Sequence, residues 1–307
     1  MIYKMQPTVI VIIVTYNGAK WIDKCFGSLR HSSIPLKTLA IDNCSSDNTP
    51  NIIRERFPEV EVIETGQNLG FGKANNIGLK RVLDENADYA FLLNQDAWVE
   101  KDTVEKLVEA HNKYTGYALV CPLQLNGAGN SIDDLFFRYT IALTQPLVAD
   151  SIIHKTQEIY ETPFANGACW LMPLSTINSI GGFDPLFTHY GEDNDYINRM
   201  HRHKMKVGLC PLVKVYHDRE NRGSAVSEES VINKIFMKTI VILKKNGAPR
   251  SKLFYFFEMI RLRAHYLLFR KKNSYYEYKA LRKLLNIYDE VRLRYSHEQK
   301  KEALYLK

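Results

Sequence analysis

The sequence predicts an α/β protein, in which helices cover both faces of a sheet and a helical region follows at the C-terminus. Three observations support this. Over about the first 120 residues, aliphatic runs alternate with segments of helical period. The first run, Val9–Thr15, is apolar and largely β-branched, as in a strand buried on both faces. From about Ser227 onward only helical periods remain.

The first part of the chain predicts four strands that alternate with helices. After the strand Val9–Thr15, apolar residues between Trp21 and Leu29 recur at helical spacing. We expect further strands at Thr38–Ile41, Val60–Ile63 and Tyr89–Leu93, and helices from Pro50 to Phe57, over Gly70–Val82 and after a capping Asp102.

The second part of the sequence is less regular. Gly127–Pro163 has no strong period and is predicted to be loop-rich. Beyond it we expect strands at Ala168–Met172, Val207–Cys210 and Val213–His217, helices at Pro173–Ile180 and Asp193–His203, and C-terminal helices at Ser230–Lys245, Ser251–Arg270 and Ser274–Arg294. The predicted domains are residues 1–224 and 225–307.

Polar residues follow three of the predicted strands at the point where each strand ends. They are Thr15-Tyr16-Asn17, Asp42-Asn43 and Asn94-Gln95-Asp96. Because ligands of parallel α/β sheets bind beyond the carboxyl ends of the strands, the three groups predict one site at one edge of the sheet. Asp96 could bind a divalent cation that neutralises a diphosphate, or be a turn residue.

Two further groups carry candidate chemistry. Glu192, Asp193 and Asp195 place three acids in four positions, which fits either a general base with a raised pKa or an acidic helix N-terminus. His217 ends a predicted strand and could bind a metal, contact phosphate or be structural. Arg219 and Arg222 could clamp phosphate.

Several enzyme classes are excluded by missing motifs. Asn68–Gly72 contains only G-x-G, after the third strand, so the dinucleotide-binding fingerprint is absent, and no P-loop, zincin or G-x-S-x-G motif occurs. The 5 cysteines are widely spaced without a C-x-x-C pair, which predicts reduced thiols in a cytoplasmic protein. We expect neither a signal peptide nor a transmembrane helix.

Six segments, taken in order, resemble family 2 glycosyltransferases of the GT-A fold. They are VIVIIVTYNG (9–18), IDNCSSDN (41–48), NLGFGKANNIG (68–78), FLLNQDAWV (91–99), GGFDPLFTHYGEDND (181–195) and VKVYH (213–217). The resemblance is closest to bacterial rhamnosyltransferase-like enzymes that build surface polysaccharides. It implies a doubly wound mixed sheet and inverting transfer of a sugar from a UDP- or dTDP-sugar, such as dTDP-rhamnose, to a glycan or lipid-linked acceptor.

The resemblance also assigns roles to individual residues. Those implied at the nucleotide-sugar donor are Thr15, Tyr16, Asn17, Asp42, Asn68, Gly70, Asn76, Asn94 and Gln95. Asp96 matches the last acid of the family's D-x-D motif and His217 the late histidine, so both would hold Mg²⁺ or Mn²⁺. Asp193, paired with Glu192, matches the general base. Asn94 replaces the first acid of D-x-D and offers a carbonyl oxygen without the charge, which weakens the expected cation affinity.

The charge is divided unequally along the chain. Residues 233–307 hold 19 Lys and Arg against 6 Asp and Glu, whereas residues 1–232 hold 22 against 28. This basic, aromatic-rich tail fits attachment to an anionic membrane surface at the inner face of the cell membrane. Packing onto the catalytic domain or onto a second subunit of a homodimer is the alternative. A catalytically inactive nucleotide-sugar-binding or scaffold protein is the rival function, and a nucleic-acid binder lacks a recognition motif.

Overall fold

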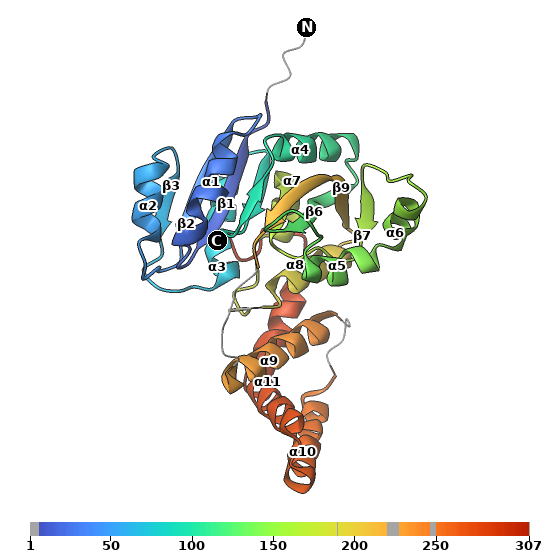
Figure 1. Cartoon of the computed structure of the whole chain (residues 1–307). Coiled ribbons are helices and arrows are strands. Elements are labelled where there is room, and N and C mark those ends of the chain that lie inside the picture. Colours follow the sequence, from blue (N-terminus) through green and yellow to red (C-terminus); the bar gives the residue numbers. More distant parts are fainter. Residues whose placement is uncertain (1–5, 189, 220–226, 246–249, 307) are drawn as a thin grey trace.

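The sheet has the mixed, doubly wound arrangement that the sequence predicts (Figure 1). The computed structural model describes residues 6–188, 190–219, 227–245 and 250–306. The strands in these ranges are β1 (Val9–Thr15), β2 (Leu36–Asp42), β3 (Glu61–Glu64), β4 (Tyr89–Leu93), β5 (Ala97–Val99), β6 (Tyr117–Asn126), β7 (Tyr160–Thr162), β8 (Cys169–Pro173) and β9 (Lys206–His217). Their order is β3-β2-β1-β4-β8-β6-β9-β5, with β7 beside β9. Strands β3, β2, β1 and β4 are parallel, and β8 is antiparallel to β4 and β6.

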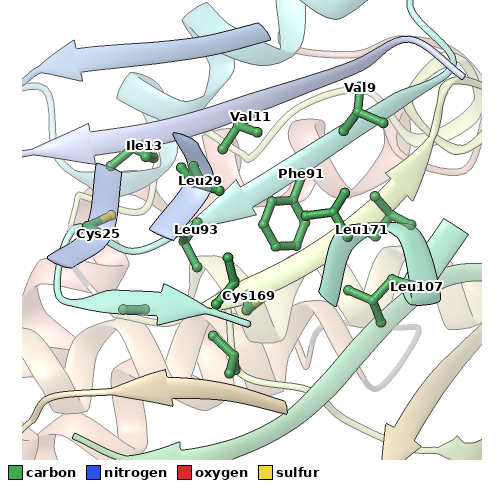
Figure 2. Packing of buried hydrophobic residues seen from close by; sticks show 14 of the residues in the cluster. Val9, Val11, Ile13, Cys25, Leu29, Phe91, Leu93, Leu107, Cys169 and Leu171 are labelled. Carbon is green, nitrogen blue, oxygen red and sulfur yellow. The ribbon is translucent and has the colours of Figure 1, made fainter. Parts of the chain in front are cut away.

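Strand β1 lies inside the sheet and is buried on both faces. Val9, Val11 and Ile13 pack into the core on one face, and Ile10 and Ile12 into the core on the other. This alternation follows from the two-residue period of a strand, and it explains why the whole run is apolar. Figure 2 shows the first of these cores, in which β1, β4 and β8 meet two helices.

The helices divide between the two faces. The first face is covered by α1 (Ile22–Arg30), α2 (Thr49–Arg56) and α4 (Thr103–Lys113). The second is covered by α3 (Phe71–Asp84), α5 (Asp134–Tyr139), α6 (Gln145–Ile152), α7 (Leu174–Ile180) and α8 (Glu192–Arg202). Two short 3₁₀ helices in the described residues are η1 (Ala19–Trp21) and η2 (Ile141–Leu143).

The structure corrects three sequence predictions. Gly127–Pro163 is not mainly irregular: it forms α5, η2, α6 and β7, elements too short to show a clear period. The two strands predicted around Pro211 are one strand, β9, whose pairing with β6 shifts register between Cys210 and Lys214. Asp102 precedes α4, but its carboxylate pairs with Lys106 (2.7 Å) instead of capping the helix.

Three helices form the C-terminal region, as predicted, and project from the sheet on the side opposite to the N-terminus (Figure 1). They are α9 (Glu228–Lys245), α10 (Lys252–Phe269) and α11 (Lys272–His297). The domain boundary predicted at 224–225 lies outside the described residues. In the described part of the chain, no helix is long and apolar enough to cross a bilayer.

The end of the chain returns to the sheet domain. Gly182 N–H donates to the Leu304 carbonyl (2.8 Å), and the buried Leu306 joins the core on the second face of the sheet. The helical region is therefore tied to the sheet domain both by its packing and by the residues that follow α11.

Candidate active site

The parallel strands bring the predicted strand-end residues to one edge. Thr15 lies opposite Asp42 in the β1–β2 pairing, and β4, which precedes Asn94, pairs with β1 on its other side. His217 ends β9 opposite Ala97, the residue after Asp96. The edge therefore collects residues from four strands, as the sequence predicts for the first three.

A set of hydrogen bonds fixes the loops after β1 and β2. Asp42 is buried, and its Oδ1 accepts the hydroxyls of Thr15 (2.8 Å) and Ser45 (2.6 Å). Asn17 Oδ1 accepts the amides of Ser46 (2.8 Å) and Asp47 (3.3 Å). In this structure Thr15, Asn17 and Asp42 thus hold the two loops in place.

The Gln95 side chain joins the loop after β4 to the loop after β1. Its Oε1 accepts the Tyr16 amide (2.9 Å) and its Nε2 donates to the Tyr16 carbonyl (3.0 Å). A Cβ atom at Gly18 would lie 2.1 Å from Gln95 Oε1, so a side chain at residue 18 would break this contact. The Tyr16 ring itself stays exposed at the edge of the sheet and is available to a ligand.

Asn68 is oriented by the backbone that follows it. Its Oδ1 accepts the Gly70 amide (2.9 Å) and the Asn43 side chain (3.0 Å), while Asn43 Oδ1 accepts the Leu69 amide (2.7 Å). Gly70 has φ +78°, and a Cβ atom there would lie 2.1 Å from the Thr188 carbonyl oxygen. A residue other than glycine would therefore displace the loop that leads into α3.

Asn76 differs from the other residues predicted at the nucleotide sugar, because its side chain binds residues in the C-terminal half of the chain. Its Oδ1 accepts the Phe183 amide (2.7 Å), and its Nδ2 donates to the carbonyls of Phe183 (2.8 Å) and Tyr305 (3.4 Å). Its amide group is thus used to hold the turn at 181–184 and the end of the chain, which gives it a positioning role.

Asp96, His217 and Asn94 converge at the strand ends. His217 Nε2 lies 3.2 Å from Asp96 Oδ1 and 3.5 Å from Asn94 Nδ2. Asp96 and His217 are both buried. Arg219 Nε, which also pairs with Asp133 (3.0 Å), donates to His217 Nδ1 (3.2 Å). Arg222, the second predicted phosphate clamp, lies outside the described residues.

The side chains of Asp96, His217 and Asn94 form a set of ligands that fits a hard divalent cation. A carboxylate, an imidazole and an amide that can turn its oxygen inward lie within ligand-to-ligand distance, and diphosphate oxygens would complete the coordination. The protein ligands alone carry a single carboxylate, so the cation and the diphosphate would bind together.

Glu192 and Asp193 open helix α8, where both carboxyl groups are partly buried. Burial, and then the charge of Asp193, raise the pKa of Glu192 to about 8. Burial also raises the pKa of Asp193, against hydrogen bonds from Asn194 and the Gly167 amide that lower it. A carboxylate with a raised pKa is the better proton acceptor, as a general base requires.

A short segment before β8 connects the two parts of the site. The Ala168 carbonyl accepts the Asn94 amide (2.9 Å), and Gly167 lies against Asp193, with its amide directed at that carboxylate. The preceding Asn166 is buried, yet neither polar atom of its side chain has a hydrogen-bond partner in the described structure. An unpaired buried amide is costly, so the site supplies polar groups that a ligand could satisfy.

The sequence alone does not identify Asn166, because this residue is uncharged and belongs to no motif in the loop before β8. The signal was present in the run Asn166-Gly167-Ala168, where a glycine precedes an apolar strand. The sequence alone also does not separate Asp195 from Glu192 and Asp193. In the structure Asp195 faces away from the pair and contacts Lys244 (2.7 Å) and Arg199 (3.1 Å).

A second acidic cluster is therefore structural. Asp184, Asp195 and Glu298 lie within ligand distance of one another, the arrangement of a metal site. The Lys244 ammonium already occupies its centre, 2.7–2.8 Å from each carboxylate. Burial opposes ionisation of Asp184, yet the charges of Lys244 and Arg294 hold its pKa below the ordinary value. This cluster joins α8 to α9 and to the end of the chain.

Comparisons with known proteins identify the family of the chain. Residues 10–174 match the family model of glycosyl transferase family 2. The low-salt glycan biosynthesis hexosyltransferase Agl10 of Haloferax volcanii is 25% identical over 229 residues, covering 70% of each chain. The N-acetylglucosaminyl-diphospho-decaprenol L-rhamnosyltransferase of Mycobacterium tuberculosis is 24% identical over 245 residues, covering 70% of this chain and 77% of the relative.

Solved structures show the same fold. The mannosyltransferase PcManGT from Pyrobaculum calidifontis, in complex with GDP-Man and Mn²⁺, superposes with a TM-score of 0.58 at 16% identity, covering 96% of this chain and 74% of the other. The family model spans more than half of the chain, and the neighbours confirm the GT-A fold. The chain therefore belongs to glycosyl transferase family 2 and is a glycosyltransferase.

Proposed function

We propose that the chain is an inverting transferase that moves a sugar from a UDP- or dTDP-sugar, such as dTDP-rhamnose, to a hydroxyl group of a glycan or lipid-linked acceptor in cell-surface polysaccharide synthesis. One observation carries the proposal. The segment 166–168 holds Asn94, beside Asp96 and His217, on one side and Asp193 on the other. A leaving-group site and a base thus flank one short stretch of backbone.

The donor would lie across the loops after β1, β2 and β4. Tyr16 offers an exposed ring for stacking on the base, while the Asp42 and Gln95 contacts keep its loop in shape. Asn68 and Gly70 shape the entry to α3, next to Thr188. The name of the rhamnosyltransferase relative supports a lipid-linked sugar as acceptor, and the GDP-Man complex of the mannosyltransferase neighbour supports a sugar nucleotide as donor.

Asp96 and His217 would hold a Mg²⁺ or Mn²⁺ ion, with the Asn94 carbonyl oxygen as a further ligand. Such an ion supplies charge neutralisation for the leaving diphosphate. Mn²⁺ in the named complex of the mannosyltransferase neighbour supports a cation in this fold. Arg219 donates to His217 Nδ1 in this structure, which leaves the proton of a neutral imidazole on Nε2. Cation binding through Nε2 would therefore require the proton to move to Nδ1 and Arg219 to keep only its contact with Asp133.

Asp193 would act as the general base. It takes the proton of the acceptor hydroxyl, whose oxygen attacks the anomeric carbon from the face opposite the diphosphate. The new carbon–oxygen bond forms as the bond to the phosphate oxygen breaks, so the configuration inverts and no covalent sugar–enzyme intermediate arises. At neutral pH Glu192, with its pKa of about 8, is mostly protonated and can donate a hydrogen bond near the acceptor.

Donor binding and product configuration test the proposal. The full chain is incubated with a panel of UDP- and dTDP-sugars, with and without Mn²⁺, and donor binding is read from the melting temperature. We expect one donor class to stabilise the protein in a Mn²⁺-dependent way, and its transferred or hydrolysed product to show an inverted anomeric centre by NMR.

Asp193→Asn separates binding from chemistry. This variant should bind the same donor and lose turnover, while Asp84→Asn, an exposed acid at the end of α3, should behave as the unchanged protein. A product with retained configuration would contradict the mechanism. Donor binding by the unchanged protein without turnover of any donor would point to the rival function, a nucleotide-sugar-binding or scaffold protein.

A further inference from the structure

Helix α10 presents an apolar face that no other part of the described structure covers. Its exposed apolar residues fall at positions i, i+3, i+4, i+7, i+14 and i+15, which lie on one side of a helix. They are Leu253, Phe256, Phe257, Ile260, Leu267 and Leu268, with exposed fractions from 44% to 75%. We call these six residues the α10 stripe. Ala264, also exposed, lies on the same side.

The opposite side of α10 accounts for its fold without the stripe. Leu262 is buried, and Tyr255 and Met259 pack against the core that α9 and α11 share. The rings of Tyr255 and Tyr288 of α11 are 6.0 Å apart. Since this inner side already anchors the helix, the stripe is free of a role in packing and must have another reason to be apolar.

Basic side chains border the stripe. Between Lys252 and Lys272 there are six Lys and Arg residues and a single acid, Glu258, which pairs with Arg261. Arg263 flanks the stripe on the other side, and Arg270, Lys271 and Lys272 follow the end of α10. The surface is therefore apolar along its centre, and the residues around it carry a net positive charge.

We propose that the α10 stripe lies in the interface of an anionic lipid membrane, with the helix parallel to the surface. Apolar side chains would enter the boundary between headgroups and acyl chains while the arginines and lysines contact lipid phosphates. The helix is too short and too charged to span the bilayer. A second copy of the chain fits less well, because pairing two stripes would bring two cationic margins together.

The position of α10 suits this orientation. It lies at the tip of the helical region, far from the sheet and on the side opposite to the N-terminus (Figure 1). Strand β1 runs from the N-terminal side toward the helices, so the strand ends that form the candidate active site face the same side as α10 (Figure 1). The inference stands on the surface of α10 and does not depend on which donor or acceptor the enzyme uses.

Vesicle flotation tests the proposal with the full chain. Vesicles of phosphatidylglycerol and phosphatidylcholine are compared with vesicles of phosphatidylcholine alone. We expect binding to the anionic vesicles that weakens as salt rises, and much weaker binding to the neutral ones. The double variant Phe257→Gln, Leu268→Gln should bind anionic vesicles at least about tenfold more weakly, since it removes two of the most exposed stripe residues.

Two matched variants assign the effect. Ile152→Gln with Leu212→Gln also replaces two exposed apolar residues, but on α6 and β9, and should bind as the unchanged protein does. Arg263→Gln with Lys272→Gln should lose the preference for anionic vesicles. Melting curves verify that each variant is folded.

Several results would overturn the proposal. They are equal binding by the stripe variant and the unchanged protein, no binding to anionic vesicles, and equal binding to neutral ones. Sedimentation of the unchanged protein as a dimer that the stripe substitutions dissociate would assign the stripe to a second copy instead.

Discussion

The acids of helix α8 have opposite surroundings. Glu192 and Asp193 begin α8 without a cationic partner among the described residues, and burial raises the pKa of both. Asp195, two residues later, contacts the Lys244 ammonium and the Arg199 guanidinium. Acids two positions apart on one helix thus differ: Asp195 belongs to a structural ion cluster, and Asp193 is the proposed proton acceptor.

The difference lies in what the rest of the chain brings to each group. Lys244 comes from α9 and Glu298 from beyond α11, and both reach the Asp195 side of α8. On the other side Gly167 lies beside Asp193, and Phe71 lies beside Gly167, and neither residue brings a charged side chain. The charge of Lys244 lowers the pKa of Asp184 in the ion cluster, whereas burial raises the pKa of Glu192 and Asp193.

The largest effect should follow from Lys244→Met. Without the ammonium, the three carboxylates of Asp184, Asp195 and Glu298 would repel one another in a buried place. We expect a loss of about 3–5 kcal/mol in the free energy of unfolding, measured by denaturant titration. The control Lys245→Met changes the exposed neighbour and should stay within about 0.5 kcal/mol of the unchanged protein. Equal effects of the two variants would contradict the assigned role of the cluster.

Asp193→Asn should break the other group with the opposite signature. We expect kcat to fall about 10²–10⁴-fold while the melting temperature stays the same or rises, because a neutral amide avoids the cost of a buried charge. Asp195→Asn should instead lower the melting temperature and leave the kcat of the folded protein closer to normal. If Asp195→Asn abolished turnover in a fully folded protein, the division of α8 into two groups would be wrong.

Sequence patterns predicted those parts of the molecule that depend on near neighbours. Local periods predict strand β1 and the three C-terminal helices. The placement of Thr15, Asp42 and Asn94 at one edge follows because the carboxyl ends of parallel strands meet there. The family and the GT-A fold, implied by the resemblance of ordered motifs, are confirmed.

What the sequence did not predict depends on partners far along the chain. Asp195 differs from Asp193 through Arg199 on the same helix and through Lys244, 49 positions away. Asn76 binds Phe183 and Tyr305, which no local pattern associates with it. The strand β9 continues through Pro211 because its pairing with β6 is irregular there and needs no hydrogen bond from the proline. The sequence pattern alone predicts that the strand ends at this proline.

An intermediate effect is expected at the proposed cation ligands. Asp96→Asn should raise the Mn²⁺ concentration for half-maximal activity by about tenfold or more, since it removes the one carboxylate of the set. Asn94→Asp should lower it, because it adds a charge beside His217. His201→Gln, on the exposed side of α8, is the control and should leave the requirement unchanged. A Mn²⁺ requirement that none of these substitutions moves would place the cation elsewhere.

The smallest effect at neutral pH should be that of Glu192→Gln, and it grows with pH. The folded-state pKa of Glu192 is about 8, above its ordinary value of 4.5, so the protein is most stable while this group is protonated. As pH rises from 4.5 through 8, the unchanged protein must ionise a buried carboxyl and loses stability, whereas the glutamine variant does not. The melting temperature of Glu192→Gln should therefore exceed that of the unchanged protein by more at pH 9 than at pH 5, with most of the kcat retained at pH 7.

The control is Glu109→Gln, which changes an exposed acid and should show no such trend with pH. A constant difference between the curves of Glu192→Gln and the unchanged protein would contradict the raised pKa of Glu192.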